Sequence, residues 1–187
     1  GKHPWYALVE ISSGRSEEEA EALMAELFES AFNDGHVRDA ALAQSNKQQD
    51  DFWRLRHGMS SVQKFEGGSI KHDVSVPVSD MPDFIIEASE AVKAAMPNCR
   101  PVPFGHLGDG NIHFNVSQPI GVDKDVFLAE WDRINDIVHD IVQNYNGSVS
   151  AEHGIGMNKK PYLSLTRSDA EINTIFLRWS VRTEPML

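Results

Sequence analysis

Two histidines flank a Gly-Asp-Gly centre in the segment PVPFGHLGDGNIHFNV, which spans residues 101–116. If this segment folds as a hairpin that turns at residues 108–111, His106 lies opposite His113 and both side chains project from one face of the sheet. Two imidazoles held in this way by strands can bind one metal ion. The alternative interpretation makes them ordinary polar residues at the strand ends.

A third candidate ligand lies in the segment SAEHGIG, residues 150–156. Small residues and glycines make a poor packing element, so Glu152 and His153 are expected to be accessible. A site of two histidines and one glutamate leaves a coordination position open, so that a substrate can bind the metal directly. Alternatively, Glu152 is a solvated strand end and His153 is a surface residue.

A candidate anion-binding site involves Arg56 and Ser60, which share one face of a predicted helix because residues four apart on a helix are neighbours. Lys71, on the polar side of a predicted strand, adds a second cation. A guanidinium group binds a carboxylate through two parallel hydrogen bonds, whereas an ammonium group acts as a point charge. The three residues together predict a carboxylate-binding site, although most Arg and Lys side chains are simply solvated.

These residues must be positioned by helices and strands that alternate along the chain. Hydrophobic periodicity and capping residues predict helices over residues 16–35, 46–65, 80–97 and 122–146, and a last helix that begins at Ser168. Strands are expected at residues 5–12, 36–43 and 69–78, in both arms of the hairpin, and at the start of residues 147–156. A hairpin in such a series favours an α+β fold, an antiparallel sheet covered by helices, over a doubly wound parallel sheet.

Composition excludes several classes of function. The chain of 187 residues is 41% hydrophobic with a formal net charge of −11, which argues against nucleic acid or an anionic membrane as a main partner. No glycine-rich motif for nucleotide phosphates is present. Residues 1–15 do not resemble a signal peptide, and Cys99 is the single cysteine, so we expect an intracellular, cytoplasmic protein without internal disulfides.

Four segments carry a specific family resemblance: FWRLRHGMS, SIKHDVSVP, PVPFGHLGDGNIHFNV and GSVSAEHGIGMNKKPYL. Together they resemble the C-terminal half of flavin-dependent D-2-hydroxy-acid dehydrogenases of the vanillyl-alcohol-oxidase type. This family includes D-lactate dehydrogenase, the flavin-dependent component of glycolate oxidase and D-2-hydroxyglutarate dehydrogenase. The resemblance implies that residues 1–187 form a single C-terminal substrate domain, a ferredoxin-like cap, and that the N-terminal FAD-binding half is not in this chain.

The resemblance also assigns roles to the chemical site. It makes His106, His113 and Glu152 ligands of a divalent metal, usually zinc, and His153 the catalytic base beside the flavin. The metal then acts as a Lewis acid on the 2-hydroxyl group, His153 takes the hydroxyl proton, and the C2 hydrogen leaves as hydride to FAD. The product is the 2-oxo acid.

Further positions match the substrate and flavin contacts of the family. Arg56, Ser60 and Lys71 match residues that bind the substrate carboxylates, and Asn111 falls in the stretch nearest the flavin ring. Two cationic positions favour a substrate with a second carboxylate, such as 2-hydroxyglutarate or malate, without excluding lactate. The electron acceptor is left open.

The implied partners are this small acid and the FAD-binding half, and apolar residues uncovered on the isolated cap would favour a homodimer.

Two functions of other classes are also compatible with these residues. A metal-dependent hydrolase would use Glu152 or His153 as base on a metal-bound water. A non-catalytic interaction module would need no metal, and it predicts that His106, His113 and Glu152 do not converge.

Overall fold

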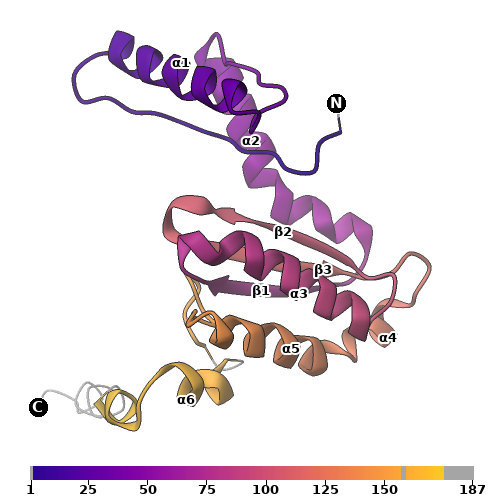
Figure 1. Cartoon of the computed structure of the whole chain (residues 1–187). Helices are drawn as coiled ribbons and strands as arrows, with labels where there is room; N and C mark the ends of the chain where they lie inside the picture. Colours follow the sequence, from indigo (N-terminus) through magenta and orange to yellow (C-terminus); the bar gives the residue numbers. More distant parts are fainter. Residues whose placement is uncertain (1, 157–158, 175–187) are drawn as a thin grey trace, which may run out of the picture. The chain divides into compact units, whose positions relative to one another are not determined.

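The computed structural model describes residues 2–156 and 159–174 (Figure 1). The chain divides into two compact units, residues 1–61 and residues 62–187, which are described separately below. None of the helices in the described part of the chain combines the length and apolar composition that a membrane span requires.

The first unit is built around two helices, α1 (Glu17–Asn33) and α2 (Asn46–Val62), both close to their predicted bounds. Ser16 caps α1 as its sequence pattern predicts, because its side chain accepts a hydrogen bond from the backbone N–H of Glu19 at 3.2 Å. None of the residues of α1 is buried, and Leu23 and Leu27 are 47% and 46% exposed.

The strands predicted at residues 5–12 and 36–43 are wrong. Both segments are irregular in the structure, and Trp5 and Tyr6 are 62% and 73% exposed. A strand needs a neighbouring strand to satisfy its backbone N–H and C=O groups. A short apolar run can suggest that pairing but cannot supply the partner, and neither segment joins the sheet described below.

The second unit contains a three-stranded antiparallel sheet of β1 (Ser69–Ser75), β2 (Arg100–His106) and β3 (Asn111–Ser117) in the order β1-β3-β2. Helices α3 (Met81–Ala95) and α5 (Trp131–Asn144) pack against each other and against this sheet (Figure 1). This arrangement confirms the predicted α+β fold with an antiparallel sheet covered by helices. The short elements are η1 (Gln63–Glu66), η2 (Val78–Asp80), η3 (Leu107–Asp109), α4 (Lys124–Leu128), η4 (Lys160–Tyr162) and α6 (Leu163–Thr166).

The two faces of the sheet differ because side chains alternate along each strand. One face supplies apolar side chains to the core beneath α3 and α5, where Ile70, Val74 and Phe114 are fully buried. The opposite face is largely polar. Its residues, taken from the strand register, include Lys71, Asp73, Phe104, His106, Asn111, His113 and Asn115.

The hairpin between β2 and β3 differs from the predicted register. His106 lies opposite Asn111, and Phe104, not His106, lies opposite His113. The reason is the turn: residues 107–109 form a short 3-10 helix, and Gly110 follows with a φ of 73°. The pairing therefore moves by two positions, which keeps both histidines on the same face of the sheet.

The helix predicted over residues 122–146 is two helices, α4 and α5. The Asp123 side chain caps α4 by accepting hydrogen bonds from the N–H groups of Asp125 and Val126. At the other end, the N–H of Glu130 bonds to the carbonyl of Phe127 at 3.1 Å, which tightens the last turn before α5 begins. Both helices still contribute to the core, since Phe127 of α4 and Ile134 of α5 are buried.

Candidate metal and acid–base site

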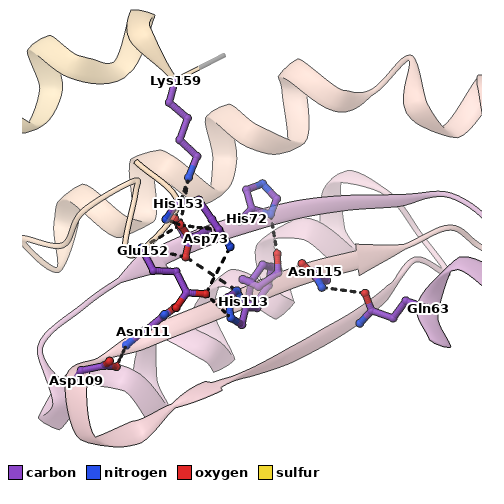
Figure 2. A network of polar contacts seen from close by, with 11 residues as sticks. Gln63, His72, Asp73, Asp109, Asn111, His113, Asn115, Glu152, His153 and Lys159 are labelled. Carbon is purple, nitrogen blue, oxygen red and sulfur yellow. Dashed lines mark hydrogen bonds and ion pairs between the residues drawn. The ribbon is translucent and has the colours of Figure 1, made fainter. Parts of the chain in front are cut away.

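The site forms where the polar face of the sheet meets the segment that follows α5 (Figure 2). Ser148 pairs with Ser75 at the end of β1 through two backbone hydrogen bonds of 2.8 and 2.9 Å. The N–H of Ala151 then donates to the carbonyl of Asp73 at 3.2 Å. The predicted strand is thus a single bridge, and these bonds guide the chain so that the next two residues, 152 and 153, lie beside the sheet.

His106, His113 and Glu152 converge. One ligand atom from each lies within 4.8 Å of the others, and Nε2 of His113 is 3.3 Å from Oε1 of Glu152. Two imidazoles and one carboxylate are a common ligand set for zinc and suit other divalent metals that accept nitrogen and oxygen. The residues therefore fit a metal ion, and their convergence differs from the geometry expected of the non-catalytic interaction module.

The site is open to solvent on one side. His106 is exposed, and the Glu152 side chain is 46% exposed. The His113 side chain is only 16% exposed, and its ring centre lies 5.0 Å from that of Phe104. A metal held here would have protein on the sheet side and room for a substrate on the other.

His153 lies next to the ligand set. Its Nε2 atom is 3.5 Å from Oε1 of Glu152, and its ring centre is 5.9 Å from that of His113. Its other ring nitrogen, Nδ1, is 3.1 Å from Oδ2 of Asp73. The side chain is 66% exposed, which suits a group that exchanges protons with a bound molecule.

The sequence analysis missed Asp73 and Lys159. The Asp73 residue is only 7% exposed, and its Oδ2 accepts hydrogen bonds from the N–H groups of Glu152 and His153 at 3.1 and 2.9 Å. The Lys159 ammonium group donates to the Asp73 carbonyl at 2.9 Å. The available sequence signal for Asp73 was an acid on the polar side of an alternating strand.

Several interactions set the protonation of Asp73. Burial by itself raises the pKa of this carboxyl group, but the two backbone N–H groups and the nearby Lys159 outweigh burial and leave the pKa below its ordinary value. Burial also lowers the pKa of Lys159, and the Asp73 charge opposes that change. Asp73 is therefore a carboxylate at neutral pH.

The residues predicted to contact the substrate and the flavin do not form one cluster as the three predicted metal ligands do. Lys71 is exposed on the site face of β1 and lies opposite Asn115 on β3, two positions along the strand from Asp73. Asn111 is 4% exposed, and its Oδ1 has no hydrogen-bond partner among the residues that the structure describes. Arg56 and Ser60 lie on α2 in the first unit, so their joint site with Lys71 remains a prediction.

Known proteins match this chain over most of its length. The model of the family described as FAD linked oxidases, C-terminal domain, matches residues 1–175. The chain is 41% identical over 169 residues to a D-2-hydroxyglutarate dehydrogenase of Stutzerimonas stutzeri, which covers 90% of this chain and 36% of that protein.

Two other relatives agree. Identity is 40% over 171 residues to a D-2-hydroxyglutarate dehydrogenase of Xanthomonas citri, covering 91% of this chain and 35% of that protein. It is 32% over 165 residues to the mitochondrial D-2-hydroxyglutarate dehydrogenase of Rattus norvegicus, covering 88% and 29%. The chain thus spans about a third of the length of the curated relatives it matches. On the strength of the family match over nearly all its residues, the chain belongs to the C-terminal domain family of the FAD linked oxidases.

Proposed function

We propose that this chain is the substrate- and metal-binding part of a flavin-dependent dehydrogenase that oxidises a D-2-hydroxy acid to the 2-oxo acid. The observation that carries the proposal is the convergence of His106, His113 and Glu152 beside His153 on one open face. The family match supports FAD as the cofactor of the whole protein. The matched relatives are named D-2-hydroxyglutarate dehydrogenases, so D-2-hydroxyglutarate is the first substrate to test.

The proposed chemistry divides between bound groups and the chain. His106, His113 and Glu152 would hold a divalent metal, most simply zinc, whose Lewis acidity would favour loss of the substrate hydroxyl proton. FAD, bound mainly by residues outside this chain, would supply the hydride acceptor. His153 would accept the hydroxyl proton at Nε2, because this atom lies on the side of the proposed metal ligands.

The proposed substrate contacts come from cations and from the polar face. Lys71 would attract a carboxylate to the site face of β1, where Asn115 lies opposite it. Arg56 and Ser60 would bind the second carboxylate of a dicarboxylic substrate, and Asn111 would lie nearest the flavin. The Phe104 ring beside His113 would exclude water from one side of the reacting centre.

Metal analysis of the purified chain tests this proposal. We expect the wild type, after incubation with zinc and removal of excess, to retain about one zinc per chain, and His113→Ala to lose most of it. His36→Ala is the matched control, because His36 is exposed and lies in the other unit. Equal zinc contents in the wild type and His113→Ala would overturn the proposed metal site.

Substrate binding gives a second measurement. D-2-hydroxyglutarate should bind the zinc-loaded chain more tightly than the zinc-free chain in isothermal titration calorimetry, because the metal adds a ligand for the acid. Equal affinities would contradict the proposed role of the metal. Hydrolysis of simple esters by the zinc-loaded chain alone, lost in His113→Ala, would support the hydrolase instead.

A further inference from the structure

One buried residue of the polar face, Asp73, is hydrogen-bonded to four residues of the segment that carries Glu152 and His153. Its carbonyl oxygen accepts the N–H of Ala151 at 3.2 Å and the ammonium group of Lys159 at 2.9 Å. Its Oδ2 accepts the N–H groups of residues 152 and 153. Four donors from one segment therefore converge on a single residue of β1, and Figure 2 shows three of the residues that supply them, Glu152, His153 and Lys159.

Two of these four contacts, those from the N–H groups of residues 152 and 153, go to the side-chain carboxylate, which is costly to bury. A buried charge is tolerated when hydrogen bonds and an opposite charge compensate it, and an apolar side chain of similar size is often at least as stabilising. Here the compensation comes from the site segment itself: two of its N–H groups and Lys159, whose Nζ lies 4.0 Å from Oδ2. The carboxylate and the segment that carries Glu152 and His153 are thus joined by two hydrogen bonds and one ion pair.

Asp73 also faces the ring of His153. Oδ2 lies 3.1 Å from Nδ1 of His153. A carboxylate only accepts hydrogen bonds, and Asp73 is the nearer of the two carboxylates beside this ring, at 3.1 Å against 3.5 Å for Glu152, so in the neutral imidazole the proton is expected on Nδ1. The lone pair then belongs to Nε2, which lies 3.5 Å from Oε1 of Glu152.

We propose that Asp73 is a positioning residue: it holds the backbone of Glu152 and His153 against the sheet and orients the His153 ring with Nε2 toward the metal ligands. The meaning of this role for catalysis rests on the proposed function above, but the role itself concerns residues of this chain alone. Residues that orient metal ligands and bases in this way typically change metal affinity by about 10–100-fold when they are replaced.

The test combines NMR with zinc titration on the whole chain. Long-range ¹H–¹⁵N spectra at pH 8 report which ring nitrogen of His153 carries the proton. We expect the Nδ1–H form in the wild type and a mixture of tautomers in Asp73→Ala, with zinc affinity about 10–100-fold lower. Asp73→Asn keeps one oxygen acceptor without the charge, so it should restore part of both properties.

Asp140→Ala is the control, because it removes an exposed aspartate from α5 and should change neither measurement. An Nε2–H tautomer in the wild type would overturn the proposed orientation of His153 without any variant, even if Asp73→Ala fails to fold. An unchanged tautomer and zinc affinity in folded Asp73→Ala would overturn the whole inference. A wild type that binds no zinc, but shows the expected tautomers, would overturn the proposed function and leave the orienting role intact.

Discussion

Nε2 of His113 lies 3.3 Å from Oε1 of Glu152, although one residue belongs to the central strand β3 and the other to the segment that follows α5. Without a cation, this contact joins an imidazole that is 16% exposed to a carboxylate that is 46% exposed. A single contact with a carboxylate that is partly in water stabilises a protein little by itself. Together with His106, the same atoms make a suitable metal site.

The first prediction concerns zinc and stability. Zinc that binds only the folded chain should raise its free energy of unfolding by about 2.7 kcal/mol when its concentration is 100 times the dissociation constant. His106→Ala should lose most of this gain, because one of three ligands is missing. Thermal unfolding with and without zinc measures the difference. A full zinc effect in His106→Ala would show that this histidine is not a ligand.

The second prediction concerns Gly110, which ends the hairpin turn. Its φ is 73°, and a Cβ atom there would lie 2.2 Å from the carbonyl oxygen of Val76. Gly110→Ala should therefore lower the free energy of unfolding by about 1–3 kcal/mol from backbone strain, with the clash adding to this loss. Gly108→Ala is the matched control within the same turn, since nothing lies within 4 Å of its added Cβ. We expect it to change stability by less than about 0.5 kcal/mol in urea unfolding; equal losses would contradict the proposed origin of the strain in the turn.

The third prediction concerns pH and two histidines buried between the sheet and α5. Burial lowers the pKa of His72 to about 3 and that of His139 to about 4. Both rings are therefore neutral in the folded protein over a range where the unfolded chain binds a proton, with a pKa of about 6.5. Stability should be fully present above pH 6.5 and should fall as the pH drops toward 4.

Each of these histidines should contribute about 2 kcal/mol of destabilisation between pH 8 and pH 5. Urea unfolding across this range measures it. His139→Gln should remove about half of the pH dependence, because one of the two buried rings no longer titrates. His36→Gln replaces an exposed histidine and should leave the dependence unchanged. A pH profile of His139→Gln that parallels the wild type would refute this origin.

The fourth prediction concerns Lys71 and substrate charge. Lys71→Met should weaken binding of D-2-hydroxyglutarate to the zinc-loaded chain by about 10-fold. A hydrogen bond to a charged group is worth about 1.5–3 kcal/mol. Because Lys71 is exposed, we expect the low end of this range, which corresponds to about a tenfold change in the dissociation constant. Lys93→Met, an exposed lysine on α3, should have no effect. Calorimetric titration measures the affinity of both variants for D-2-hydroxyglutarate. Equal affinities would show that Lys71 does not bind the substrate.

The outcome for the hairpin shows how far local patterns reach. The spacing of His106 and His113 about a glycine-rich turn was enough to place both on one face. It did not determine the register, because a short 3-10 turn followed by Gly110 moved Phe104 opposite His113. The strand predicted at residues 5–12 failed for a related reason, since strand formation depends on a partner that local sequence does not specify.

The sequence by itself determined the features that depend on neighbours along the chain: the cap of α1 at Ser16, the alternation of β1, the hairpin and the residue types suited to a metal. Tertiary structure alone decided which distant groups meet. It brought Glu152 to His113 and buried Asp73 beneath the segment that carries Glu152. The physical reason is that helix periods, caps and turns are short-range properties of the backbone, whereas contacts between remote segments depend on how the whole core packs.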